Sequence, residues 1–155
     1  MDCQEARQAL DQADVIHDEE AVAAALDQVA AQITTALSDR QPLVLCVMTG
    51  GLVFAGQLIT RLRFPLDLDY LHVTRYGQDI TGGALSWRAA PWTKVHGRTV
   101  LVVDDILDAG VTLAAVKESL TRMGAAEVLT AVFADKANGK KKPISADFVG
   151  LSVPD

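Results

Sequence analysis

One segment, residues 99–113, constrains the fold of this 155-residue chain more than any other. It starts with the apolar run Val100–Val103, which is typical of a strand buried on both faces of a parallel sheet. Two adjacent acids, Asp104 and Asp105, follow where we expect this strand to end, and the apolar spacing over 113–123 predicts a helix. The segment therefore predicts a strand–turn–helix unit of an open α/β sheet, in which ligands bind outside the carboxyl ends of the strands.

The turn between this strand and helix carries groups that suit an anion. It consists of a third acid and four small or branched residues, Asp108, Ala109, Gly110, Val111 and Thr112. Backbone N–H groups at a helix N-terminus and the Thr112 hydroxyl can surround a phosphate, while the paired carboxylates can bind sugar hydroxyls or a divalent cation. A phosphorylated sugar suits the whole segment. The same acids are also common as helix N-caps and turn residues, so Asp108 has both interpretations.

The remaining apolar patterns alternate between strands and helices. Asp18 is a suitable N-cap for a helix that ends near Ser38, and Pro65 is expected to end a second helix carrying Phe54 to Leu62. Strands are expected at 43–48, 66–73, 100–103, 128–134 and 148–153. This order predicts a single α/β domain over residues 1–155, with a mainly parallel central sheet flanked by helices on both faces.

A long polar segment interrupts this alternation. Residues 76–91 are rich in glycine and polar side chains, and connections of this length in a compact chain are commonly functional loops. We expect a flexible lid loop or a hairpin here, with Trp87 in a short returning strand. Because parallel strands point the same way, the turn at Met48–Gly51, the segment 104–112 and the pair Asp135–Lys136 are expected at one sheet edge.

Composition excludes several classes of function. The chain has 14 basic and 20 acidic residues and a net charge of −6, which disfavours nucleic acid as a partner. No apolar run reaches the length of a membrane span, and the acidic, polar N-terminus differs from a signal peptide, so we expect a cytoplasmic protein without membrane contact. Cys46 lies in an apolar strand and Cys3 in a polar terminus, which predicts a core residue and an incidental one rather than a disulfide.

The segment 99–113 resembles the phosphoribosyl-pyrophosphate (PRPP) signature of the type I phosphoribosyltransferases. From about Asp14 to Asp155 the chain resembles the hypoxanthine-guanine branch of that family. The resemblance implies purine salvage, in which a Mg²⁺-dependent enzyme transfers the 5-phosphoribosyl group of PRPP to hypoxanthine or guanine and yields IMP or GMP and pyrophosphate. It also implies a homodimer or homotetramer.

The resemblance assigns roles to the residues of the signature. Asp104 and Asp105 would hold the ribose hydroxyls of PRPP and support Mg²⁺, although the family usually has Glu at the first position. The loop 108–112 would hold the 5′-phosphate. Asp108 would act as the general base that accepts a proton from the purine.

Two further segments receive roles from the resemblance. Met48, Thr49 and Gly50 match the pyrophosphate loop, in which relatives commonly carry Lys or Arg where Thr49 stands, and Arg75 could supply the missing charge. The glycine pair that starts at Gly50 has a second interpretation, an ordinary strand-to-helix turn without a ligand. Tyr76 matches the start of the family's flexible lid.

On the purine side, the resemblance implies that Lys136 contacts the exocyclic oxygen of 6-oxopurines and that Ile106 lies against the base. Without the resemblance, Lys136 would be interpreted as a surface residue. The neighbouring run Lys140–Lys142 is expected to form a solvated loop.

The resemblance stops at Asp155, because relatives continue into a segment that stacks on the purine and helps to hold a second Mg²⁺. We expect the chain to lack this C-terminal segment. An alternative function follows from this departure and from Thr49, namely a PRPP-binding regulatory protein without base transfer. The retained Asp108 and Lys136 favour the enzyme.

Overall fold

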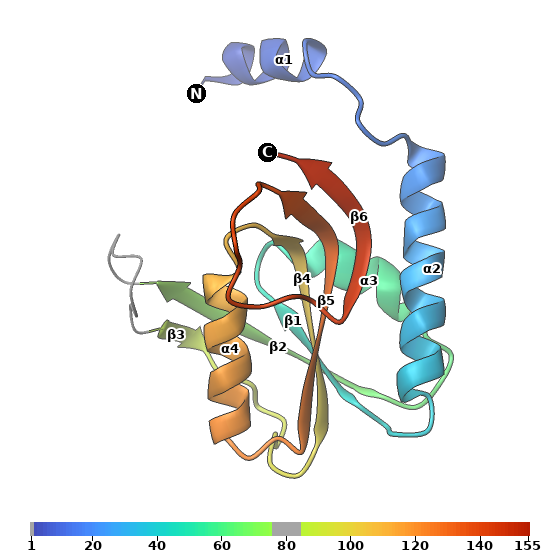
Figure 1. Ribbon diagram of the computed structural model, residues 1–155, viewed down its shortest axis with the longest axis vertical. Helices are drawn as coiled ribbons and strands as arrows, with labels where there is room; N and C mark the ends of the chain where they lie inside the picture. Colours follow the sequence, from blue (N-terminus) through green and yellow to red (C-terminus); the bar gives the residue numbers. More distant parts are fainter. Residues whose placement is uncertain (1, 76–84) are drawn as a thin grey trace.

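The computed structural model describes residues 2–75 and 85–155. Helices and strands alternate along most of the described chain (Figure 1). In chain order the elements are α1 (Cys3–Asp11), α2 (Glu19–Leu37), β1 (Leu43–Val47), α3 (Leu52–Ile59), β2 (Asp67–Arg75), β3 (Leu85–Ala89), β4 (Thr99–Leu107), α4 (Val111–Arg122), β5 (Glu127–Ala137) and β6 (Phe148–Pro154).

The strands form one sheet in the order β3-β2-β1-β4-β5-β6. Strands β2 and β3 are antiparallel, and every other neighbouring pair is parallel. The predicted mainly parallel α/β sheet is therefore confirmed, as is the short returning strand with Trp87, which pairs with Val73. The predicted lid and Tyr76 lie outside the described residues.

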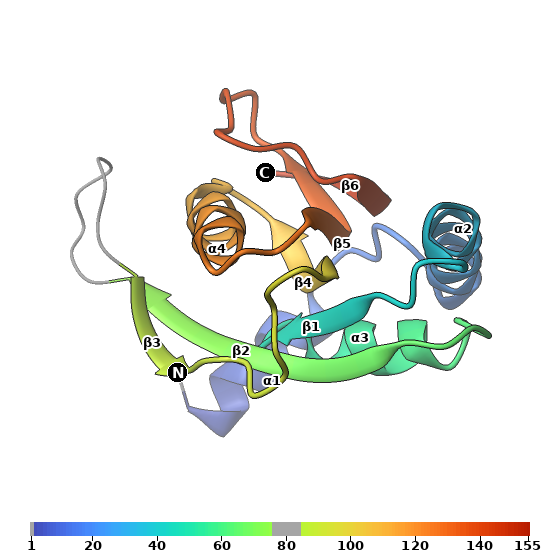
Figure 2. The ribbon, with the colours of Figure 1, turned by 90° about the horizontal axis from the view of Figure 1, so that it is seen from below.

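Helices cover both faces of the sheet and enclose two hydrophobic cores. Helices α2 and α3 pack on one face, where Leu101 and Val103 of β4 meet Cys46 of β1. Helix α4 packs on the other face against Val100 and Val102 (Figure 2). Cys46 is 4% exposed, which confirms its predicted place in the core. Apolar residues on both faces of β4 explain its uninterrupted hydrophobic run.

The N-terminal part contains one predicted and one unpredicted helix. Asp18 caps α2, since its Oδ1 accepts from the Ala21 N–H at 2.8 Å. Helix α1 was not expected, yet Asp2 and Glu5 form a capping box at its start. None of its residues is buried, and Figure 1 shows it apart from the sheet. In the described part of the chain, no helix combines the length and apolar content needed to span a membrane.

Two central strands extend further than the apolar runs predict. β4 continues through Asp104 and Asp105 to Leu107, and β5 continues to Ala137, with Leu107 opposite Asp135. The acid pair and Lys136 thus lie within the sheet rather than after it. The backbone hydrogen bonds of the β4–β5 ladder explain the difference, because they hold polar residues in strand conformation where hydropathy alone indicates an end.

Candidate active site

The acid pair at the carboxyl end of β4 is held by its own backbone. The Asp105 N–H donates to Asp104 Oδ1 at 2.9 Å, and the Ile106 N–H donates to Asp105 Oδ1 at 2.8 Å. Burial raises the pKa of Asp104 to about 7, and the charge of Asp105 adds to this rise. The half-buried Asp104 and exposed Asp105 therefore form an acceptor pair that favours hydroxyl donors or a cation.

The turn between β1 and α3 lies directly against this pair. A Cβ atom at Gly50 would lie 2.6 Å from Asp105 Oδ2, so only glycine permits the observed approach. The Met48 N–H donates to Leu71 O at 2.8 Å, and the peptide bond between Met48 and Thr49 is cis. Thr49 and Gly50 are exposed. The turn therefore lies beside the carboxylates, and its role toward pyrophosphate stays a prediction.

The loop before α4 has the geometry of an anion-binding helix N-terminus. Gly110 is the N-cap, with a φ of +76° in the left-handed region, and the first helical bond runs from the Ala114 N–H to Gly110 O at 3.0 Å. The N–H groups in the first turn, which contains Val111 and Thr112, have no partner within the helix. The interpretation of Asp108 as the N-cap is wrong, because Gly110 occupies that position.

Asp108 meets Lys136 across the ends of β4 and β5. The Lys136 Nζ lies 3.8 Å from Asp108 Oδ1 and 2.7 Å from Asp155 Oδ1. The hydrogen bond to Asp155 and the two negative charges raise the pKa of Lys136, and the same contact lowers the pKa of Asp155. The sequence did not indicate Asn138, whose Nδ2 donates to Asp108 O and to Asp108 Oδ1, each at 3.4 Å. The structure thus brings a carboxylate and an ammonium group together on one side of the acid pair.

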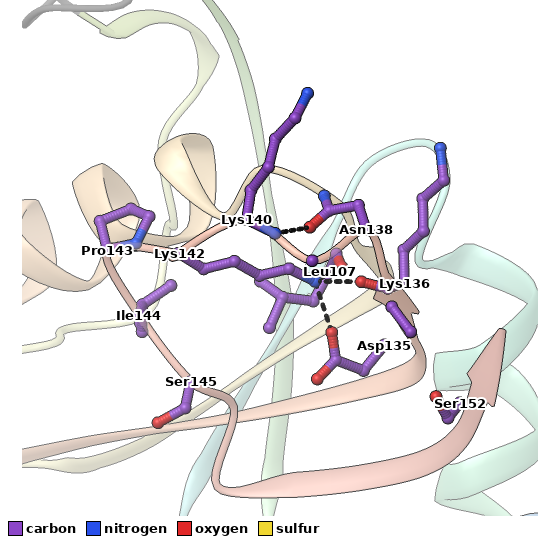
Figure 3. A pocket seen from close by; sticks show the side chains of 12 residues that line it. Leu107, Asp135, Lys136, Asn138, Lys140, Lys142, Pro143, Ile144, Ser145 and Ser152 are labelled. Atoms are coloured by element: carbon purple, nitrogen blue, oxygen red, sulfur yellow. Dashed lines mark hydrogen bonds and ion pairs between the residues drawn. The ribbon is translucent and has the colours of Figure 1, made fainter. Parts of the chain in front are cut away.

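A pocket of about 530 Å³ opens beside this contact (Figure 3). Its walls are the carboxyl ends of β4 and β5, residues 137–140 and 142–145, and Ser152 of β6, with Lys136 among the lining residues. Ile106 on β4 remains 41% exposed, which is unusual for an isoleucine in a central strand. Its side chain is therefore available to a planar apolar ring.

The expectation of a solvated Lys140–Lys142 loop is wrong for Lys142. Lys140 and Lys141 are exposed, but the Lys142 side chain is only 13% exposed. Its Nζ donates to Leu107 O, Lys136 O and Asp135 Oδ1 at 2.6, 2.7 and 2.6 Å. Three acceptors for the three N–H groups of an ammonium explain how a lysine can be buried here.

Two residues predicted for the pyrophosphate and lid regions have no described contact with the site. Arg75 is the last residue of β2 and is half-buried, and its buried Nε has no hydrogen-bond partner among residues 2–75 and 85–155. Its predicted role toward pyrophosphate stays a prediction. Tyr76 lies outside the described residues.

Asp104 and Asp105 fit a Mg²⁺ site completed by a ligand. No cluster of three or more His, Cys, Asp or Glu residues that could hold a metal occurs in the described ranges, 2–75 and 85–155. Mg²⁺ commonly takes one or two carboxylates and completes its shell with water and phosphate oxygens. The raised pKa of Asp104 indicates a carboxylate pair that a cation would stabilise in its charged form.

Comparison with known protein families gives one match that spans most of the chain. Residues 12–155 match the phosphoribosyl transferase domain family. This range contains all the predicted site residues and every element from α2 to β6.

Individual relatives agree with this match. The chain is 32% identical over 142 residues to the hypoxanthine-guanine phosphoribosyltransferase of Bacillus subtilis (strain 168), which covers 91% of this chain and 79% of the relative. It is 30% identical over 140 residues to the hypoxanthine-guanine-xanthine phosphoribosyltransferase of Tritrichomonas foetus, covering 90% and 76%. The crystal structure of a Staphylococcus aureus hypoxanthine phosphoribosyltransferase shares the fold, with a TM-score of 0.87, 24% identity and coverage of 96% and 82%.

Proposed function

Because this chain belongs to the phosphoribosyl transferase domain family, we propose that it transfers the 5-phosphoribosyl group of PRPP to hypoxanthine or guanine in purine salvage. The products are IMP or GMP and pyrophosphate. One observation carries the proposal: Asp108 and Lys136 lie 3.8 Å apart, beside the acid pair and the anion loop. A protein that only binds PRPP needs neither group.

The sugar-phosphate side holds PRPP through three contacts. Asp104 and Asp105 accept hydrogen bonds from the ribose hydroxyls, and the free N–H groups at the start of α4 bind the 5′-phosphate. The turn 48–50 takes the pyrophosphate, and Arg75 supplies positive charge to it. These contacts fix the anomeric carbon in one place, which lowers the entropic part of the barrier.

Asp104 and Asp105 would hold Mg²⁺ together with oxygens of PRPP. When bound, the ion neutralises negative charge on the departing pyrophosphate. Since Thr49 stands where relatives carry a basic residue, the acid pair that recruits this positive charge is especially important in this chain.

The purine side supplies the proton acceptor and the recognition of the base. The bond between the anomeric carbon and a pyrophosphate oxygen breaks, a bond from a purine ring nitrogen forms, and Asp108 accepts the proton that this nitrogen loses. Lys136 donates to the 6-oxo oxygen of the purine, whereas adenine presents an amino group there. The exposed side chain of Ile106 packs against the ring.

Product analysis with a panel of bases tests this function. The chain is incubated with PRPP and Mg²⁺ and with hypoxanthine, guanine, xanthine or adenine in turn, and the nucleotides are identified by mass spectrometry. We expect IMP and GMP, with little or no AMP. A preference for adenine would contradict the role of Lys136, and xanthine measures how broadly the site accepts 6-oxopurines.

The alternative is a regulatory protein that binds PRPP without transferring it. The observation that favours it is Thr49, which leaves the turn between β1 and α3 without the basic side chain common in relatives. PRPP binding measured by calorimetry, with no nucleotide formed from any base, would establish this alternative.

A further inference from the structure

Lys142 is the most completely bonded lysine near the site, although no part of the proposed chemistry uses it. Figure 3 shows its side chain running inward to Leu107 and Asp135, while the side chains of Lys136 and Lys140 point away from it. Each of its three hydrogen bonds is 2.6–2.7 Å long. Charge-assisted hydrogen bonds of this length are among the strong ones in proteins.

The three acceptors belong to two neighbouring strands. Leu107 is the last residue of β4 and directly precedes Asp108, whereas Asp135 and Lys136 lie near the end of β5. Leu107 and Asp135 are paired in the β4–β5 ladder. A single ammonium group therefore binds the backbone next to the proposed base and the backbone of the proposed purine-binding lysine.

The stem of Lys142 also lies close to the anion loop. A Cβ atom at Gly110 would lie 3.5 Å from Lys142 Cβ and 3.2 Å from Ile144 Cγ2. The segment around Lys142 and Ile144 thus packs against the glycine that starts α4. Lys142 therefore lies next to both the proposed 5′-phosphate loop and the proposed purine side of the site.

We propose that Lys142 is a positioning residue that sets the placement of Asp108 relative to Lys136 during transfer. This inference rests on the proposed function, since it assigns those two residues their roles. The physical reason is that the polypeptide at Asp108 and Ala109 is exposed and has left the sheet, so its geometry depends on how Leu107 is anchored. Without the ammonium group, two carbonyls and one carboxylate lose a shared donor.

The first arm of the test compares Lys142→Met with Lys141→Met. Both variants lose one positive charge, but Lys141 is exposed and makes none of these contacts. Asp135 keeps 41% side-chain exposure, so water can solvate it and we expect the Lys142 variant to fold. Hydrogen–deuterium exchange should accelerate about tenfold in peptides covering 104–112 and 134–142 in Lys142→Met alone.

The second arm measures transfer kinetics in the same variants. Lys142→Met should lower kcat for hypoxanthine by about 10- to 100-fold while the Kd for PRPP stays within about twofold, because the misplaced groups act on the purine. Lys141→Met should match the parent protein. If Lys142→Met instead only unfolded part of the protein, the amount of protein that binds PRPP would fall, and kcat per bound site would not change.

The double variant Asp135→Asn/Lys142→Met separates positioning from charge compensation. It removes the carboxylate that Lys142→Met leaves unpaired, so its melting temperature should return toward that of the parent while kcat stays low. Full recovery of kcat would overturn the inference, and so would equal exchange in Lys142→Met and Lys141→Met. If the parent chain forms no nucleotide but exchange is still faster in Lys142→Met than in the parent, the proposed function is overturned and the anchor between β4 and β5 is supported.

Discussion

The two sides of the proposed site are built in different ways. The sugar-phosphate side comes from one continuous segment, 104–112, joined by a glycine turn at 48–50 that touches Asp105. The purine side is assembled from β4, β5 and the segment 138–145, which meet through side-chain ion pairs and hydrogen bonds. The first side depends on backbone geometry and the second on individual side chains, so single substitutions should affect them differently.

The largest effect is expected from the proposed base. Asp108→Asn should lower turnover by roughly 10²–10⁴-fold, because the amide cannot accept the purine proton, while PRPP affinity is retained. Turnover and PRPP binding are measured on the same preparation. Unchanged turnover would remove Asp108 from the chemistry, and equal losses of both would place its role on the sugar-phosphate side.

A smaller effect is expected when the backbone approach at the glycine turn is blocked. Gly50→Ala puts a methyl group 2.6 Å from Asp105 Oδ2 and should lower kcat/KM for PRPP by about 100-fold through displacement of the turn or the carboxylate. Gly56→Ala is the matched control, because nothing lies within 4 Å of a Cβ there and the residue is inside α3. The control should keep its activity and gain about 0.5–1 kcal/mol of stability.

Removing the purine-binding ammonium should change selectivity more than affinity for PRPP. Lys136→Ala should lower kcat/KM for hypoxanthine and guanine by about tenfold, the loss expected for one hydrogen bond from a charged donor. Discrimination against adenine should relax in the same variant. Lys141→Ala controls for charge, and an equal loss across all bases would indicate a structural role for Lys136.

The smallest effect concerns the stability of the metal-free, ligand-free protein. The pKa of Asp104 rises from 3.8 to about 7 through burial, so the folded state binds this proton more tightly than the unfolded state. The carboxyl is protonated in both states well below pH 3.8, and its ionisation costs folding free energy as the pH rises from there toward 7. Asp104→Asn should therefore stabilise the protein at pH 8 by on the order of 1–3 kcal/mol and by much less near pH 4.

Chemical denaturation in EDTA at both pH values measures this difference. A stabilisation that is the same at pH 4 and pH 8 would assign it to packing rather than to the charge of Asp104. Loss of PRPP binding in the stabilised variant would show that a binding residue carries a stability cost.

The sequence predicted the local structure at α2, at β4 and before α4 well because the signals there are local. Asp18 capping α2, the apolar run of β4 and the Gly110 turn each act within a few residues. The common edge of the parallel strands then predicted that Lys136 and Asp108 would lie near one another, 3.8 Å apart in the structure.

The parts that escaped prediction have two different causes. Helix α1 had a usable signal, the Asp2–Glu5 capping box, but none of its residues is buried, so no core contact supports it. Lys142 had no usable signal, because it stands in a run of three lysines and one of its acceptors, Leu107 O, is 35 residues away. Burial of a charged residue is decided by tertiary contacts, which local composition does not encode.

Base-dependent release of pyrophosphate tests most directly whether the sugar-phosphate side and the purine side of the proposed site act in one reaction. PRPP, Mg²⁺ and hypoxanthine or guanine are added to this chain, and release is compared with that of Asp108→Asn. We expect release that requires a 6-oxopurine and falls at least about 100-fold in the variant. PRPP binding without base-dependent release would contradict the enzyme and favour a PRPP-binding regulator.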